Sequence, residues 1–225
     1  MRTPRAAPQG AIATPPVDPE GTIDHDPTPD GPPAGGQGAR SRSQHQRRKR
    51  IVQAAAALAS RGGVEAMQMR TVAERAGVAL GTLYRYFPSK MDLVVAVVSE
   101  ELDLLEGSIE RRPPRAEGPP RRAVEVLMRA SRGLMREPEL AEALIRSLLL
   151  SDVKTGFGDR MTGMLLRAAT GTDAAVPEGD PRRVTARALS SVWTMEMIEM
   201  LRGHTTMEET QARLETIADR LLTGF

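Results

Sequence analysis

Most of the chain carries apolar residues at intervals of three and four positions, which is the spacing of one face of an α-helix. In the first such segment Ile51 and Leu58 lie on one side, and Gly62-Gly63 follows as a stop signal. The next segment, MRTVAERAGV, has a short apolar face of its own, and LGTLYRYF then forms one more helix of about two turns. Two short helices joined by a tight glycine-containing turn predict a helix-turn-helix.

A longer helix is predicted after this unit, in PSKMDLVVAVVSEELDLLEGSIERR, because a wide apolar stripe continues there. Pro88 suits its first turn, and Ser89 with Asp92 resembles a capping box, with Phe87 as the alternative cap. RPPRAEGPP then breaks the chain, and helical patterns resume at 121–135, 138–151, 155–169, 182–203 and 207–223. No stretch alternates like a strand for long, so the chain is predicted to be all-α, with about nine helices.

The composition divides the chain into three parts. Residues 1–42 are rich in proline and glycine, and such a segment buries too little apolar surface to offset the entropy of ordering. We therefore predict a disordered N-terminal extension, and an inert role for it is favoured over a functional one. Residues 43–90 contain the helix-turn-helix, and residues 91–225 contain the remaining helices.

The composition also excludes several kinds of site. The chain has no cysteine, which removes disulfides and thiolate metal sites, and its three histidines are far apart. GFGDRMTG has two spaced glycines, but no strand precedes it and its spacing differs from the dinucleotide-binding motif. There is no phosphate loop and no nucleophile elbow. We predict a protein that is not an enzyme and that holds no metal and no cofactor.

The chain shows no signal for a membrane. No apolar run approaches the roughly 18 residues needed to cross a bilayer. The N-terminus carries charge but lacks the apolar segment of a secretory signal. We therefore predict a cytoplasmic protein with no membrane partner.

The net charge of +2 conceals an uneven distribution. Residues 40–90 hold eleven lysines and arginines against two acids, whereas the segments on either side are net acidic. A compact basic segment is typical of a surface that binds nucleic acid, although a solvated helix face is the alternative. The helix-turn-helix beside this charge favours double-stranded DNA as the partner.

The aromatic residues are also concentrated in this segment. The chain has six of them, and three lie within YRYF. Helical spacing predicts that Phe87 points inward and anchors the following helix, while Tyr84 and Tyr86 face outward toward DNA. The alternative is that the two tyrosines cover the underside of the small helical unit.

Further residues of this segment suit a DNA contact. Ala79 and Gly81 are small enough for backbones to approach, and Thr82 offers a hydroxyl to a phosphate oxygen. Arginines at the start of the first helix either form an arm on the phosphates or minor groove or are simply solvated. The predicted DNA contacts are Arg47, Arg48, Lys49, Gln68, Arg70, Ala79, Leu80, Gly81, Thr82, Tyr84, Arg85, Tyr86 and Lys90.

The stretch TVAERAGVALGTLYRYFPSKMDL resembles the DNA-binding signature of the TetR family of bacterial repressors. The resemblance implies a homodimer on a palindromic operator, with three N-terminal helices for DNA. About six further helices would then serve ligand binding and dimerisation, with the segments 182–203 and 207–223 at the dimer seam. Many members cap the second helix with serine or threonine where this chain has Gln68. Either that helix starts elsewhere, or Gln68 reaches a phosphate.

Within this family, RRKRI, SRGG, MQMR and YRYFPSK are very similar to the same region of a repressor of cholesterol catabolism in actinobacteria. That similarity implies a steroid-acid CoA thioester as the effector and sterol degradation genes as the regulon. A repressor of efflux or of another lipid pathway, with a different hydrophobic effector, is the alternative. A helical interaction protein that does not bind DNA is the alternative of another class.

Flexible methionines in the C-terminal half favour a pocket for a bulky apolar effector, with ordinary core packing as the alternative. Arg146 either faces an acidic group of that effector or is solvated or paired. The predicted pocket residues are Leu144, Leu148, Phe157, Met161, Met164, Trp193 and Met197.

Overall fold

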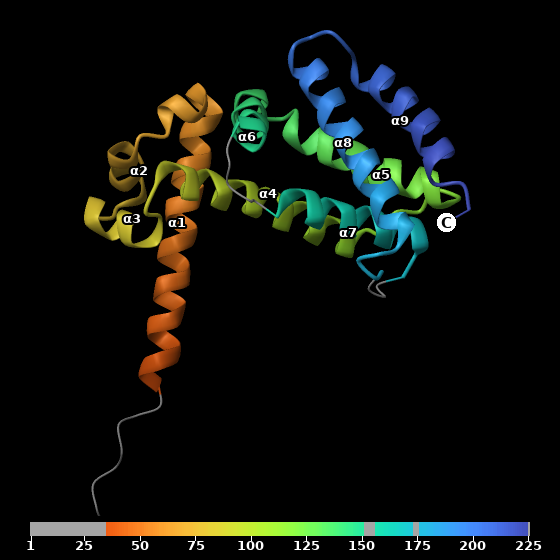
Figure 1. Ribbon diagram of the computed structural model, residues 1–225. Coiled ribbons are helices and arrows are strands. Elements are labelled where there is room, and N and C mark those ends of the chain that lie inside the picture. Colours follow the sequence, from red (N-terminus) through yellow and green to blue (C-terminus); the bar gives the residue numbers. More distant parts are fainter. Residues whose placement is uncertain (1–34, 151–155, 173–175, 225) are drawn as a thin grey trace, which may run out of the picture.

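The computed structural model describes residues 35–150, 156–172 and 176–224. Within these ranges the chain forms nine α-helices and no strand, which confirms the predicted all-α class (Figure 1). No described helix is long and apolar enough to cross a membrane. The helices are α1 (Gly35–Ala66), α2 (Met69–Ala76), α3 (Leu80–Tyr86), α4 (Lys90–Arg111), α5 (Pro119–Leu134), α6 (Pro138–Leu150), α7 (Phe157–Thr170), α8 (Pro181–Leu201) and α9 (Met207–Leu221).

The first helix differs from its prediction at both ends. It begins at Gly35, so residues 35–42 are helical rather than part of the predicted extension, and residues 1–34 lie outside the described range. The stop predicted at Gly62-Gly63 is a kink, after which α1 continues to Ala66. Gly63 has φ of 64° and ψ of −164°, a conformation open essentially to glycine alone. The two glycines therefore redirect the helix instead of ending it.

Local capping sets the starts of the later helices. Ser89 Oγ accepts a hydrogen bond from the Asp92 backbone N–H at 3.1 Å, and Asp92 Oδ2 accepts one from the Ser89 N–H at 2.9 Å. This reciprocal pair confirms the predicted capping box and excludes Phe87 as the cap of α4. Pro88 precedes the cap, so its predicted place in the first turn is wrong. Thr206 and Glu209 form the same arrangement at the start of α9.

The helices form a small unit and a larger body joined by α4. In Figure 1, α1 to α3 lie together at one side, and α4 runs from them into the body built from α5 and α7 to α9. α6 packs beside the C-terminal part of α1 and also contacts α4 and α8. α4 therefore belongs to both parts, because it contacts α1 as well as α5, α6 and α7.

Candidate DNA-binding surface and effector cavity

The turn between α2 and α3 is closed by a glycine in the left-handed conformation. Gly77 has φ of 64° and ψ of 43°, and its backbone N–H bonds to carbonyls of the last turn of α2. The N–H of Val78 then bonds to the Ala73 carbonyl at 3.0 Å. Ala73 and Leu83 are buried in the shared core, which holds α3 across α2. This geometry is the helix-turn-helix that the sequence predicts.

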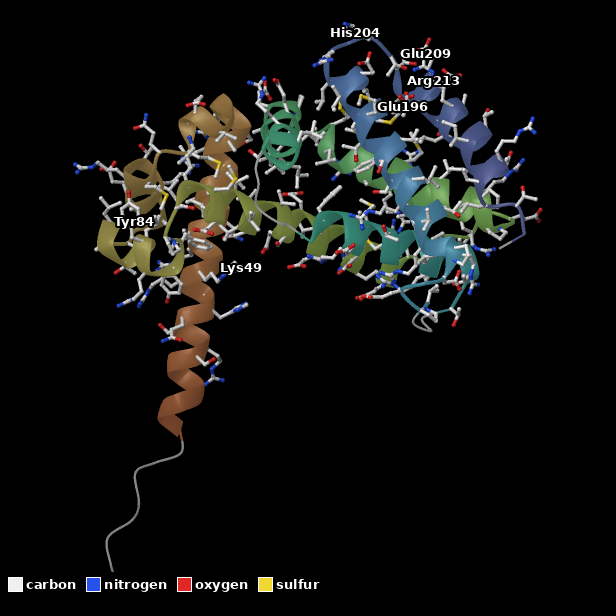
Figure 2. The ribbon with its side chains drawn as sticks, viewed as in Figure 1. Lys49, Tyr84, Glu196, His204, Glu209 and Arg213 are labelled. Atoms are coloured by element: carbon white, nitrogen blue, oxygen red, sulfur yellow. The ribbon has the colours of Figure 1, made fainter. Side chains whose placement is uncertain are left out.

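The outward face of α3 presents small and polar groups to solvent. Tyr84 remains 46% exposed, and Figure 2 shows its side chain on this helix. Ala79, Gly81 and Arg85 are exposed as well, while Thr82 is half-buried. A Cβ atom added at Gly81 would meet open space. The face therefore combines a close backbone approach with a projecting tyrosine, which suits insertion into a DNA groove.

Two predicted contacts lie closer to the core than the sequence predicts. Leu80 and Tyr86 are half-buried and pack against the apolar cluster, because α3 is a short helix that lies against α2. The Arg85 guanidinium carbon lies 6.0 Å from the centroid of the Tyr86 ring. The alternative interpretation, in which a tyrosine covers the underside of the unit, thus describes Tyr86 better than Tyr84.

Gln68 caps α2 by position but not by a side-chain bond. It lies directly before Met69, the predicted first residue, in an extended conformation with no capping hydrogen bond. The start of α2 is therefore not displaced, and the exposed amide of Gln68 remains available to a phosphate. Arg70 is likewise exposed, and Lys90 is half-buried in the first turn of α4.

The basic residues of α1 lie on a helix that projects from the rest of the molecule (Figures 1 and 2). Lys49 is exposed and Arg47 is half-buried. Arg48 turns toward the unit, and its guanidinium carbon lies 5.4 Å from the centroid of the buried Phe87 ring. A cation–π contact of this kind fixes α1 against the end of α3. Arg48 therefore has a structural contact in addition to its predicted role.

Gly81→Ala is expected to change stability and DNA affinity in opposite directions. Alanine has the higher helix propensity by about 1 kcal/mol, and its methyl group meets no atom of the protein. The same methyl group would stand on the face that is predicted to approach DNA. We expect a slightly higher melting temperature and weaker binding in a fluorescence anisotropy titration. Unchanged affinity would show that the backbone at this position does not approach DNA closely.

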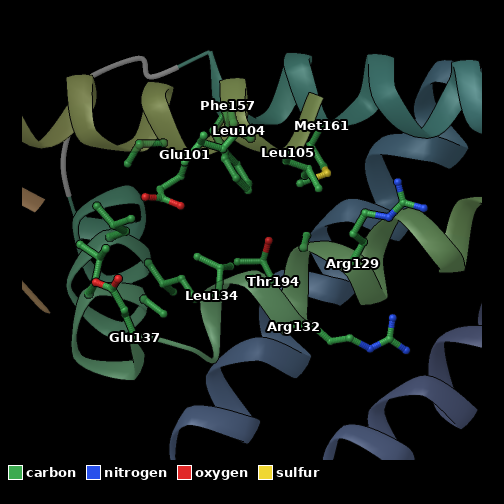
Figure 3. A pocket seen from close by; sticks show the side chains of 18 of the residues that line it. Glu101, Leu104, Leu105, Arg129, Arg132, Leu134, Glu137, Phe157, Met161 and Thr194 are labelled. Carbon is green, nitrogen blue, oxygen red and sulfur yellow. The ribbon is translucent and has the colours of Figure 1, made fainter. Parts of the chain in front are cut away.

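A cavity of about 540 Å³ lies in the larger body, walled by α4 to α8 (Figure 3). Five predicted pocket residues line it, namely Leu144, Leu148, Phe157, Met161 and Trp193. Met164 and Met197 do not line it, and both are buried in the core, at 2% and 0% exposed. For these two methionines the ordinary core interpretation is correct, because they lie on the sides of α7 and α8 that face other helices.

The wall formed by α4 and α5 is absent from the predicted pocket. It includes Glu101, Leu105 and Ser108 on α4, and Arg129 and Arg132 on α5. One sequence signal points to α4, since Glu101 occupies an apolar position of its stripe. An acidic residue in such a stripe indicates a side chain that meets something other than the core.

The polar groups of the cavity differ in how well they are satisfied. Trp193 Nε1 donates to Ser131 Oγ at 2.9 Å, and the Trp193 ring stacks on Phe157 with centroids 6.2 Å apart. Burial raises the pKa of the Glu101 carboxyl above its ordinary value, and the negative charges of Glu137 and Glu100 raise that pKa further.

Arg146 lies outside the cavity. It is exposed and pairs with Glu142 at 2.6 Å, so it is a paired surface arginine rather than a cavity group.

Comparison with known sequences gives a consistent result. Residues 51–97 match the family described as bacterial regulatory proteins, tetR family. The HTH-type transcriptional repressor KstR of Rhodococcus jostii (strain RHA1) is 38% identical over 187 residues, covering 81% of this chain and 85% of that repressor. KstR of Mycobacterium tuberculosis is 35% identical over 187 residues, covering 82% and 84%. These relatives are named as transcriptional repressors, not as enzymes.

Solved structures show the same arrangement of helices. A TetR transcriptional regulator from Rhodococcus sp. RHA1 superposes with a TM-score of 0.67 at 32% identity, covering 82% of this chain and 99% of that one. The regulator FadR of Bacillus subtilis, solved in complex with stearoyl-CoA, has a TM-score of 0.55 at 18% identity. It covers 79% of this chain and 98% of its own, and at that identity the likeness concerns the fold alone.

Proposed function

Because the chain belongs to the TetR family of bacterial regulatory proteins and is a transcriptional repressor related to KstR, we propose that a hydrophobic effector controls its affinity for DNA. The effector is a steroid- or acyl-CoA-type thioester, and the genes it controls serve sterol or lipid catabolism. The observation that carries the proposal is the course of α4, which starts beside the helix-turn-helix and then forms a wall of the cavity. Operator DNA lies in the cytoplasm, so the proposal places the protein there too.

The operator contact is assigned to the exposed face of α3 and the basic part of α1. Tyr84, Gly81 and Ala79 supply groove contacts, and Lys49 with its neighbours supplies phosphate contacts. Phosphate contacts release counterions, so the affinity falls steeply with salt concentration. Leu80 and Tyr86 serve mainly to hold α3 in place, with their exposed edges at the periphery of the contact.

A homodimer is supported by α8. Its outer side carries Val184 and Met195, which are 71% and 57% exposed, and the exposed Ala188 lies between them. Two such helices with their α9 neighbours would cover these residues in a four-helix seam. Twofold symmetry then places two α3 helices on the half-sites of a palindrome, about one helical turn apart.

The cavity supports an apolar effector of considerable size. Its volume of about 540 Å³ and its leucine, methionine and aromatic walls are typical of a small-molecule site. The similarity of RRKRI, MQMR and YRYFPSK to a repressor of cholesterol catabolism favours a steroid-acid CoA thioester. The second candidate function is repression of another regulon in response to a different hydrophobic effector. The apolar walls support it, because they discriminate between effectors by size more than by chemical identity.

Fluorescence anisotropy on duplex DNA from the gene's own upstream region tests the proposal, with and without a 3-oxo-cholestenoyl-CoA thioester. We expect tight, salt-sensitive binding that the thioester releases. Binding that ignores the thioester would leave a repressor with another effector. If the protein binds neither this DNA nor a pool of genomic fragments at moderate salt, the interaction-protein alternative replaces the proposal.

A further inference from the structure

The N-terminal part of α1 extends well beyond the core of the helix-turn-helix unit. Ile51 is buried at 0% exposed, whereas residues 41–50 before it are exposed except for the half-buried Arg47. Residues 35–50, which we call the projecting segment, stand out from the rest of the molecule (Figure 1). At 1.5 Å per residue the projecting segment is about 24 Å long.

The projecting segment carries charge of one sign. The chain has no acidic residue from residue 35 to residue 64. Residues 41–50 form no ion pair with any residue that the structure describes. The basic side chains of these ten positions are therefore not neutralised within the described chain, and they are Arg42, Arg47, Arg48, Lys49 and Arg50.

The sequence of the projecting segment gives it little helical stability of its own. Isolated helices shorter than about 12–15 residues are marginal in water even when they are made of good helix formers, and this segment is little longer. It begins with GGQG, and glycine has a low helix propensity. Arg47 and Arg50 are like charges three positions apart, which repel each other on a helix. An all-basic helix without tertiary contacts is suited to a polyanion, which would neutralise its charge.

A contact with the end of α3 fixes where the projecting segment leaves the unit. The Arg48 guanidinium carbon lies 5.4 Å from the centroid of the Phe87 ring, and Phe87 is the C-terminal cap of α3. The segment thus begins beside one end of the helix that is assigned to the DNA groove. Phosphates border every groove, so they are the polyanion that this position offers.

We propose that the projecting segment lies along the DNA backbone outside each half-site and binds its phosphates as a helix. At about 3.4 Å per base pair, its length adds about seven base pairs of contact on each side. Half-site centres lie about 34 Å apart, so two segments of about 24 Å each do not fit end to end between them, which favours the outer sides. This inference rests on the proposed function, because it assumes a homodimer that binds DNA.

Anisotropy titrations of the full chain on two duplexes test the proposal. One duplex holds the operator alone, and the other adds about ten base pairs of scrambled sequence at each end, which is one helical turn. We expect the long duplex to bind several-fold to tenfold tighter. The slope of log affinity against log salt should be steeper on it by about 0.9 for each added phosphate contact. Equal affinities and equal slopes on the two duplexes would overturn the proposal.

Two charge reversals on α1 show whether the projecting segment causes the preference. Arg42→Glu reverses an exposed charge of the segment and should remove most of the advantage of the long duplex, while binding to the short duplex changes less than twofold. Arg61→Glu makes the same change at an exposed arginine on the other side of the buried part of α1, and it should keep the advantage. The same ratio of affinities in both variants would contradict a contact by this segment.

A proline substitution tests whether the segment binds as a helix. Ser43→Pro keeps every charge but interrupts the helix, because proline lacks the backbone donor and clashes with the preceding turn. Ser43 is exposed, so the melting temperature of the protein should not change. We expect Ser43→Pro to lose the advantage of the long duplex and Ser43→Ala to retain it. If Ser43→Pro keeps the full advantage, the segment acts as a flexible charged tail and the proposed helical contact is wrong.

The outcomes separate this inference from the proposed function. If the unchanged protein binds neither duplex, the proposed function fails and the inference fails with it. If it binds both duplexes equally, the proposed function stands and the inference alone is wrong. Sedimentation velocity counts the protein copies on each duplex. A second dimer that joins the long duplex only, and that Arg42→Glu removes, would assign the segment to a contact between copies of this chain and overturn the proposal.

Discussion

Phe87→Ala is expected to lower the free energy of unfolding by about 3–5 kcal/mol, the range for removing a buried phenylalanine side chain. Phe87 is 3% exposed and closes α3, where its backbone N–H bonds to the Leu83 carbonyl at 2.9 Å. Its ring packs in the core and carries the guanidinium of Arg48 on its face. The substitution leaves a void where α1, α3 and α4 meet. Denaturant unfolding followed by circular dichroism measures the change.

The neighbouring Tyr84 supplies the control for that measurement. Its ring is 46% exposed and lies outside the buried cluster, so Tyr84→Ala removes a similar side chain without opening the core. We expect its effect on unfolding to remain within about 0.5 kcal/mol, as for other surface substitutions. Similar losses of stability in the two variants would contradict the assignment of Phe87 to the core and Tyr84 to the surface.

Tyr84→Ala is expected to remove one good groove contact from each half-site, which weakens binding about tenfold per contact and about a hundredfold for the proposed homodimer on its operator. Tyr84 is exposed on α3, one turn after the exposed Gly81. A dimer loses this contact at both half-sites, so the effect is counted twice per operator. Anisotropy titrations on operator DNA and on scrambled duplexes of the same length measure it.

The scrambled duplex separates a groove contact from a phosphate contact. Loss of a base-edge contact should weaken operator binding far more than non-specific binding and leave the slope of affinity against salt nearly unchanged. Lys49→Ala, on the exposed basic part of α1, should instead weaken both duplexes and reduce the salt slope. A Tyr84→Ala variant that binds the operator as tightly as the unchanged protein would remove this face from the contact.

Much of the architecture follows from short-range pattern. Helical periodicity predicts the nine described helices to within a few residues at most ends. It does so because the buried side of an amphipathic helix appears in the sequence as apolar residues every three or four positions. The cap of α4 can be predicted from the sequence because Ser89 and Asp92 form hydrogen bonds with each other within one turn. The helix-turn-helix can be predicted because its determinants lie within one short segment, with Gly77 ending α2 and Leu83 burying α3.

The ends of α1 depend on more than local preference. Gly62-Gly63 is a stop signal by composition, yet the chain resumes a helix beyond it, and residues 35–42 are helical although their composition predicts disorder. Glycine permits both a stop and a kink. Which of the two occurs depends on the packing of the following residues, such as the fully buried Met67, against neighbouring elements.

The sequence alone therefore determined the fold class, the helix-turn-helix and the division of its aromatic residues between core and surface at Phe87 and Tyr84. Only the tertiary structure decided that Met164 and Met197 belong to the core, that Tyr86 is half-buried, and that α4 and α5 complete the cavity. The physical reason is that the spacing of apolar residues shows which side of a helix is buried, but it does not show which other helices pack against that side. A cavity is the space that several helices leave between them, so its walls are fixed by contacts between distant segments.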